Sequence, residues 1–189
     1  MITSGDIKIR PMIDTDSDYQ LMAKWLSDPK VYKFVYGRPK NLEWVKKKYG
    51  PRIKKVENVN ACFIEYKNQP IGYMQYSPVA KAKDYGLKSN NNIWSIDIWI
   101  GEPDYWDQGI GSQTLDMLTN YIFKNLGAVK IVIDPHIDNP RAIKAYEKAG
   151  FKKVKILKAH EMYKDKKVDS WLMEIAPPRH AELDSASRP

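Results

Sequence analysis

Apolar residues recur along the chain with two different periods, which divide it into predicted helices and strands. Spacings of three and four residues predict helices over 21–26, 42–49, 109–124 and 140–149. Gly50-Pro51 is expected to close the second helix, whereas Pro29 either ends the first helix or begins another. Alternating or continuous apolar runs predict strands over 7–12, 61–66, 71–76, 93–100, 129–133, 152–160 and 168–175.

The length and composition favour one compact domain. The chain has 189 residues, against a prior of roughly 150 per domain. A hydrophobic content of 43% excludes global disorder. No apolar run approaches the roughly 20 residues needed to cross a bilayer, and the first ten residues lack the pattern of a secretory signal. We expect a soluble, cytoplasmic protein with a domain over 1–176 and a frayed tail over 177–189.

The net charge suggests which classes of partner the protein binds, and the cysteine count limits the possible cross-links. A balance of 31 Lys and Arg against 23 Asp and Glu gives a net charge of +8, which suggests a phosphate-bearing partner such as nucleic acid, a membrane surface or a small cofactor. The densest basic cluster lacks the interleaved aromatic residues of a nucleic-acid platform, so we interpret it as a solvated face; it comprises Lys46, Lys47, Lys48, Arg52, Lys54 and Lys55. Cys62 is the single cysteine and lies in an apolar run, which excludes an internal disulfide and favours a buried structural residue.

Two glycines lie at the start of the predicted helix 109–124, at a spacing that favours anion binding. Gly109 and Gly111 let backbone N–H groups converge without a Cβ, and the N-terminus of the helix adds a partial positive charge. The segment lacks both the Gly-Lys-Ser/Thr of a P-loop and the third glycine of a dinucleotide-binding fingerprint. The glycine pair by itself therefore matches neither of these two nucleotide-binding signatures.

Two segments resemble the acetyl-CoA-binding core of GNAT-type N-acetyltransferases: WDQGIG at 106–111 and NPRAIKAYEKAGF at 139–151. Trp106 departs from the Arg or Gln that the family usually carries three residues before the first glycine. This departure, together with 24–26, 96–103 and 133–136, resembles the aminoglycoside 6′-N-acetyltransferase branch. The resemblance covers 7–175 and implies an α+β fold of GNAT type. This fold is a single domain with a central mixed, mostly antiparallel sheet, flanked by helices and splayed between its two central strands.

The resemblance further implies acetyl-CoA as co-substrate, held mainly by backbone groups. The pantetheine arm would lie in the splay, and the pyrophosphate would lie at the N-terminus of the helix behind the glycine loop. The residues expected to hold acetyl-CoA are Trp99, Ile100, Gln108, Gly109, Ile110, Gly111, Ser112, Asn139, Ala142 and Tyr146. We expect Gly109 and Gly111 to tolerate no side chain.

Asp97 and Tyr146 are the candidate catalytic residues. Asp97 is an acidic residue inside an apolar strand, which is costly unless its carboxylate faces a cavity or a cation. It is a candidate base for the attacking amine, and the alternative is a structural Asp paired with a Lys or a backbone donor. In the family, the phenol that matches Tyr146 lies near the thioester sulfur, where it can protonate the leaving thiolate; the alternative is a core aromatic. Asn139 is both a helix cap and a cofactor contact in this interpretation.

A polycationic acceptor requires a locally acidic cleft in this basic protein. We expect Asp97 and Asp134 to contact the substrate, together with Tyr36 and Glu102, although loop carboxylates such as Glu102 are more often solvated. Trp25 is expected in the core. His136 is a weaker candidate base. His160 and His180 have no companions suited to metal binding, so we predict no metal site.

The predicted function is acetyl transfer from acetyl-CoA to the 6′-amine of an aminoglycoside antibiotic, by direct attack with a carboxylate base and a tyrosine acid. Two alternatives remain open. One is a GNAT that acetylates another amine, such as a polyamine, a siderophore precursor or a protein N-terminus. The other is a non-catalytic module that binds acyl-CoA or nucleic acid. We expect a small-molecule cationic amine as partner, with neither nucleic acid nor membrane, and a monomer or a homodimer.

Overall fold

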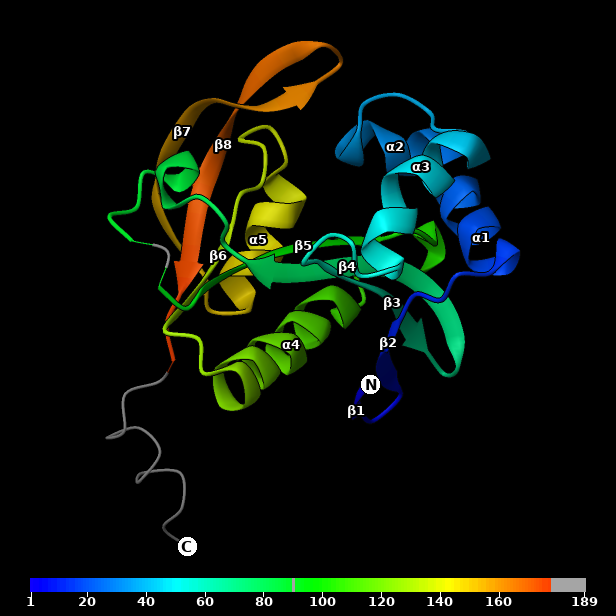
Figure 1. The fold of residues 1–189 in the computed structure, drawn as a ribbon, viewed down its shortest axis with the longest axis horizontal. Coiled ribbons are helices and arrows are strands. Elements are labelled where there is room, and N and C mark those ends of the chain that lie inside the picture. The colour runs from blue at the N-terminus through cyan, green and yellow to red at the C-terminus, as the bar shows by residue number, and fades with distance from the viewer. Residues whose placement is uncertain (90, 178–189) are drawn as a thin grey trace, which may run out of the picture.

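The computed structural model describes residues 1–89 and 91–177, which form one eight-stranded sheet with helices on both of its faces (Figure 1). The strands are β1 (Ile2–Ser4), β2 (Ile7–Pro11), β3 (Asn60–Tyr66), β4 (Gln69–Pro78), β5 (Ile93–Ile100), β6 (Lys130–Ile133), β7 (Lys152–Tyr163) and β8 (Lys166–Ile175). The helices are α1 (Asp16–Ser27), α2 (Pro29–Val35), α3 (Leu42–Ile53), α4 (Ile110–Leu126) and α5 (Pro140–Lys148), with 3₁₀ turns at Ala82–Tyr85 and Pro103–Tyr105.

The sheet is mixed and mostly antiparallel, as predicted. Its strand order is β1-β2-β3-β4-β5-β6-β8-β7, and β5–β6 is its parallel pair among the described strands. A parallel pair requires a crossover, which α4 supplies. The pairing of β5 with β6 covers Ile93–Ser95 against 130–132, and β5 then continues to Ile100 beside β4 alone. This is the predicted splay between the two central strands.

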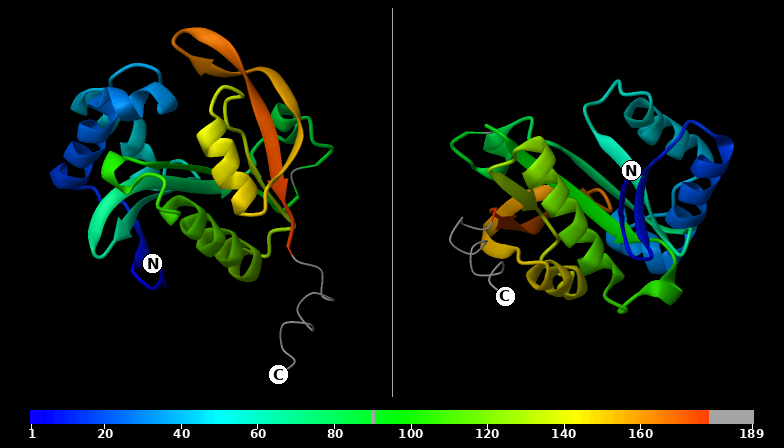
Figure 2. Two further views of the ribbon diagram at one scale, coloured as in Figure 1. Left: turned by 180° about the vertical axis from the view of Figure 1, so that it is seen from behind. Right: turned by 90° about the horizontal axis from the view of Figure 1, so that it is seen from below.

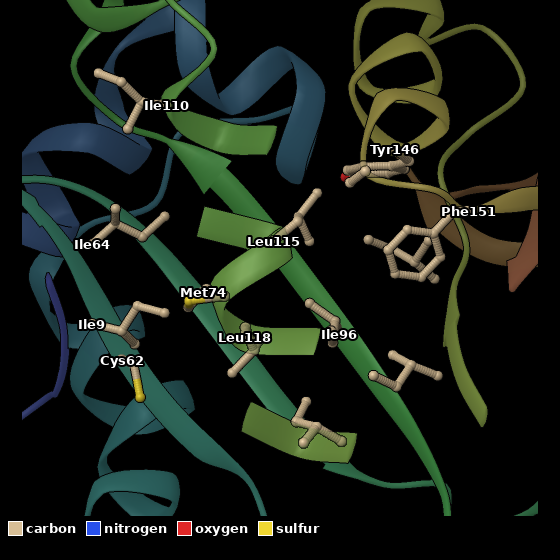
Figure 3. Packing of buried hydrophobic residues seen from close by; sticks show 14 of the residues in the cluster. Ile9, Cys62, Ile64, Met74, Ile96, Ile110, Leu115, Leu118, Tyr146 and Phe151 are labelled. Atoms are coloured by element: carbon tan, nitrogen blue, oxygen red, sulfur yellow. The ribbon is translucent and has the colours of Figure 1, made fainter. Parts of the chain in front are cut away.

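The two faces of the sheet carry two different hydrophobic layers because successive strand residues point to opposite sides. On β3, Cys62 and Ile64 pack in the cluster that includes α4 and α5, whereas Ala61 and Phe63 pack in the cluster with α1, α2 and α3. Figure 3 shows the first of these layers, in which Ile64 and other strand residues lie against α4. Cys62 is 4% exposed, and burial raises the pKa of its thiol to about 11, in agreement with a structural role.

The β7–β8 hairpin lies at one edge of the sheet, and its tip extends toward α2 (Figures 1 and 2). At its tip, the Tyr163 hydroxyl donates to the Lys33 carbonyl of α2, and Asp165 forms an ion pair with Arg38. A Cβ on Gly37 would lie 2.6 Å from the Lys164 side chain, so the tip and the α2–α3 loop are in close contact. The tip of the hairpin thereby connects the β7–β8 edge of the sheet to the helical layer that contains α2.

The local structure corrects one expectation, settles one open alternative and adds strand residues that were not predicted. Helix α3 passes through Gly50-Pro51 and ends at Ile53, because proline fits the helical φ and its missing N–H costs one hydrogen bond near the helix end. Pro29 begins α2 at its first turn, which settles the alternative left open. Strand β1 was not predicted, and β7 extends past His160 to Tyr163.

The sheet extends from Ile2 in β1 to Ile175 in β8, and the domain bounds of 1–176 stay a prediction. Residues 178–189 of the predicted frayed tail lie outside the described residues. Among the helices described, none combines the length and the apolar character required for a membrane span.

Candidate active site

A cavity of about 610 Å³ lies where β5 and β6 diverge. One wall comes from α2 and α3, the floor from β4 and β5, and the opposite wall from the glycine loop, α5 and β7. Among the predicted site residues, those that line the cavity are Tyr36, Asp97, Trp99, Ile100, Gly109, Ile110, Gly111, Ser112, Asp134, Asn139, Ala142 and Tyr146. The structure thus brings most of the predicted site together from segments far apart in the sequence.

The glycine loop supplies the anion-binding end of the cavity. Gly109 is the N-cap of α4 and has a φ of +78°, a left-handed conformation that favours glycine. A Cβ on Gly111 would meet no atom within 4 Å, so open space lies in front of this backbone. The Gln108 side chain is turned away and donates to the Asp104 carbonyl at 2.6 Å, so Gln108 offers only its backbone. The N-terminus of a 17-residue helix behind open space fits a pyrophosphate.

Trp106, the departure from the family pattern, anchors the loop to the sheet. Its indole N–H donates to the Ile100 carbonyl at 3.0 Å, and the Arg141 guanidinium lies 3.8 Å from the ring centroid. Trp106 therefore links the end of β5, the glycine loop and the start of α5. The Trp99 backbone faces β4, in the same alternation as Gly101, whose N–H donates to the Ile71 carbonyl. The predicted backbone contact from Trp99 to a pantetheine arm therefore does not fit the register, whereas the backbone of Ile100 faces the splay.

Helix α5 presents Asn139 and Tyr146 to the cavity. The Asn139 side chain accepts a hydrogen bond from the Ala142 N–H at 3.2 Å, which confirms the predicted cap. Tyr146 is 8% exposed, and its ring centroid lies 6.3 Å from that of Phe151. Figure 3 shows both side chains on the α5 side of the core. Burial raises the pKa of Tyr146, and the negative charges of Asp97 and Asp134 raise it further. Tyr146 is thus both a core aromatic and a cavity residue, and its hydroxyl stays protonated at neutral pH.

Asp97 lies on the floor of the cavity. Solvent reaches its side chain through the cavity, while protein atoms surround the carboxylate on its other sides. This burial raises the pKa of Asp97 to about 6, and the negative charge of Asp134 acts in the same direction. The hydrogen bond from the Gln75 amide, together with Arg52 and Lys48, limits the rise. A carboxylate with a pKa close to neutrality is suited to accept a proton.

Two further acidic residues border the cavity near Asp97. Asp134 Oδ2 lies 2.9 Å from His160 Nε2, and this hydrogen bond raises the pKa of His160. Burial and the charges of Asp134 and Asp97 raise the pKa of Glu161 to about 7. The sequence analysis found no companions suited to metal binding for His160, whereas the fold places ligand-type atoms of Asp134, His160 and Glu161 within 4.8 Å of one another. Sequence reasoning missed Glu161 because only the folded sheet brings it close to Asp134, which lies 27 positions earlier in the chain.

The remaining substrate candidates separate into one cavity residue and one structural residue. The Tyr36 hydroxyl lies 3.0 Å from the Tyr49 hydroxyl and lines the cavity wall. Glu102 does not line the cavity. Its carboxylate accepts from Lys24 at 2.6 Å and from the Trp25 indole at 2.8 Å, so it joins the end of β5 to α1. Trp25 is 1% exposed, in the core as expected. His136 also lines the cavity, and burial lowers its pKa.

Arg52 is a site residue that the sequence analysis placed wrongly on a solvated face. Lys46 and Lys47 of the same basic cluster are exposed, but Arg52 is 9% exposed and lines the cavity. Its guanidinium donates to Glu57 at 3.1 Å and to Gln75 at 2.5 Å. The signal available in the sequence was the helical spacing that places Arg52 three residues after Tyr49, on the face of α3 that packs against the sheet.

Comparison with known proteins identifies the family. The profile of the acetyltransferase (GNAT) domain matches residues 14–159, and the chain belongs to the GNAT acetyltransferases. This confirms the resemblance seen in the sequence, along with acetyl-CoA as the co-substrate. The aminoglycoside N(6′)-acetyltransferase type 1 of Klebsiella pneumoniae is 27% identical over 159 residues, which cover 81% of this chain and 78% of that protein. An uncharacterized protein of Methanocaldococcus jannaschii is 30% identical over 75% of this chain and 27% of its own length.

Solved structures of acetyltransferases share the fold over nearly the whole chain. The aminoglycoside acetyltransferase AAC(6′)-Ib in complex with coenzyme A and kanamycin has a TM-score of 0.74 and 22% identity, covering 96% of this chain and 99% of that one. Spermidine N-acetyltransferase from Vibrio cholerae, in complex with CoA and spermine, has a TM-score of 0.72 and 16% identity, covering 92% and 96%. The described residues therefore have the GNAT fold.

Proposed function

We propose that this GNAT acetylates a primary amine of a polycationic small molecule, with the 6′-amine of an aminoglycoside as the leading acceptor. The observation that supports this most directly is the acidic side of the cavity, where Asp97, Asp134 and Glu161 lie together in a protein whose net charge is +8. Such a group of carboxylates favours ammonium groups over neutral or anionic acceptors.

Acetyl-CoA supplies the acetyl group as a thioester. The residues that fit it are the backbone of Ile98 and Ile100 on the open side of β5, the N–H groups of Gly109–Ser112 and the start of α5 at Asn139. Open space at Gly111 and the left-handed Gly109 agree with this assignment.

Asp97 acts as the base in this proposal. An ammonium group must lose a proton before its nitrogen can attack a carbonyl carbon. Asp97 takes that proton, either directly or through a water, and its pKa of about 6 leaves it ionised and receptive at neutral pH. Asp134 and Glu161 bind other ammonium groups of the acceptor and orient the reacting amine.

Tyr146 stabilises the thiolate that leaves. Its raised pKa lies above the roughly 8.5 of an ordinary thiol. The phenol therefore donates a hydrogen bond to the developing sulfur charge more readily than it gives up its proton completely.

The test measures thiol release from acetyl-CoA with kanamycin-type aminoglycosides, spermidine and a peptide N-terminus as acceptors, with Asp97→Asn as the matched variant. We expect the aminoglycosides to react with the highest kcat/KM and the variant to be at least 100-fold slower. Preference for spermidine or the peptide would replace the aminoglycoside by that acceptor. Equal rates for Asp97→Asn and the wild type would remove Asp97 from the mechanism.

A further inference from the structure

We propose that Gln75 and Arg52 are positioning residues that hold the Asp97 carboxylate in one orientation on the cavity floor. This inference rests on the proposed function only in calling Asp97 the base. The three side chains form one continuous hydrogen-bonded chain, from Arg52 on α3 through Gln75 on β4 to Asp97 on β5.

The sheet register places Gln75 and Asp97 side by side. They are directly opposed residues of the antiparallel β4–β5 pair, so their side chains project from the same face. Tyr73, two residues before Gln75, shares this face and is completely enclosed. The face points toward α3, from which Arg52 reaches down to the strands.

Two donors fix which end of the Gln75 amide faces Asp97. The Gln75 carbonyl oxygen accepts from Arg52 at 2.5 Å and from the Tyr73 hydroxyl at 2.8 Å. The reversed amide would set its NH₂ against a guanidinium, which has no acceptor, and its carbonyl oxygen against the carboxylate of Asp97. The amide NH₂ therefore points to Asp97 and donates to Oδ2.

Arg52 can serve here without repelling a cationic acceptor because its charge is shared. Its guanidinium also donates to the Glu57 carboxylate at 3.1 Å and lies 5.3 Å from the Tyr49 ring centroid. The positive charge is thus spread over a carboxylate, an amide oxygen and an aromatic face. The group that contacts Asp97 is the NH₂ of the oriented Gln75 amide.

This arrangement leaves one carboxylate oxygen of Asp97 engaged and the other available. Oδ2 accepts from Gln75, which leaves Oδ1 as the oxygen for the acceptor amine. An anchored carboxylate needs no reorientation when the substrate binds, so less alignment is lost at the moment of proton transfer.

The test compares Gln75→Met and Arg52→Met with the wild type, and uses Lys47→Met as the matched control, since Lys47 is an exposed cation of the same helix. Two quantities are measured: the pH dependence of kcat and KM, and the titration of the Asp97 carboxyl by ¹³C NMR, assigned with Asp97→Asn. Other groups that act on Asp97 are kept intact in all three variants: Asp134, Glu161, Lys48 and Tyr146.

We expect Gln75→Met to lower kcat roughly 10- to 100-fold with little change in the acceptor KM. The midpoint of the Asp97 titration should move upward by roughly one pH unit, because a donor to the ionised form is lost. Arg52→Met should move it in the same direction and Lys47→Met should not. Thermal unfolding shows whether each variant is folded.

Unchanged titration of Asp97 in folded Gln75→Met and Arg52→Met would overturn the inference, even if kcat falls. An acceptor KM that rises with no change in kcat would overturn it as well, because Gln75 would then be a substrate contact. If the wild type acetylates none of the acceptors, the proposed function fails, and the NMR titration alone decides whether Gln75 and Arg52 hold Asp97.

Discussion

Glu102, on the loop after β5, accepts a hydrogen bond from the buried indole of Trp25 on α1 at 2.8 Å. The same carboxylate oxygen accepts from Lys24 at 2.6 Å. Gly101 beside it lies so close to the Trp25 ring that a Cβ would collide with it. These contacts make Glu102 a structural residue at the junction of the helical layer and the sheet.

Glu102→Ala should therefore destabilise the fold and spare the chemistry. Loss of the acceptor leaves the Trp25 N–H unsatisfied in the core, which costs about 1–3 kcal/mol. Urea unfolding measures the loss, and Glu102→Gln, which keeps an acceptor, should recover part of it. An acceptor KM that rises in a fully stable Glu102→Ala would return Glu102 to the substrate site.

Activity should rise with pH through about 6. Asp97 must be ionised to act as the proposed base, and burial raises its pKa from 3.8 to about 6. Glu161 titrates nearby at about 7, so Glu161→Gln is needed to separate its contribution to kcat/KM. A profile with no ionisation between pH 5 and 8 in either protein would contradict the assignment of Asp97.

The same shift has the opposite effect on stability. Because folding raises the pKa of Asp97, its contribution to stability is complete below about pH 3.8 and is lost as the pH rises through about 6. Asp97→Asn cannot ionise and escapes this loss. The free energy of unfolding of Asp97→Asn, relative to the wild type, should increase between pH 4 and pH 7. A constant difference would show that Asp97 is not desolvated.

The two glycines of the loop should fail for different reasons when they are replaced by alanine. Gly109→Ala imposes a φ of +78° on a residue with a Cβ and should lower the free energy of unfolding by roughly 1 kcal/mol. Gly111→Ala meets no protein atom, so it should fold normally and lose affinity for coenzyme A. Calorimetric titration with coenzyme A, beside thermal unfolding, distinguishes the two. Undiminished affinity in Gly111→Ala would remove this loop from the donor site.

Gly37 tests the contact between the β7–β8 hairpin and the helical layer. Gly37→Ala places a Cβ 2.6 Å from Lys164 and 2.8 Å from the Tyr163 ring, at a φ of +69°. The tip must move away, which should expose the hairpin backbone to faster amide exchange and lower the unfolding temperature. Gly5→Ala is a control for backbone strain alone, since its φ is +54° and no atom lies within 4 Å. Equal effects of the two substitutions would show that the tip contact is unimportant.

Much of the fold could be predicted because the hydrophobic periodicities and the capping residues that determine its elements are local in the sequence. The charge of Asp97 inside an apolar strand and the Asn139 cap before Pro140 are both readable along the chain. Pro51 was misread because proline usually ends a helix, whereas the buried contacts of Tyr49 and Arg52 hold α3 through its last turn.

The part of the site that could not be predicted depends on tertiary contacts. Arg52 was grouped with its neighbours in sequence, although α3 turns it inward. Gln75 has no local signal, since an amide on a strand resembles any other polar residue until its partner strand is known. Glu161 and Asp134 meet only because β7 and β6 lie on either side of β8.

The three residue pairs that join β5 to β6 have a consequence for how the domain can be divided. Asp97 lies two residues after Ser95, and Asp134 directly follows Ile133. Each carboxylate therefore lies just after the segment in which β5 and β6 are paired. The part of the chain up to the end of β5 supplies Asp97 and the wall formed by α3. The part after β5 supplies the glycine loop and Tyr146. Neither part therefore holds all of the proposed catalytic residues, and the strands that carry Asp97 and Asp134 pair through one short parallel ladder.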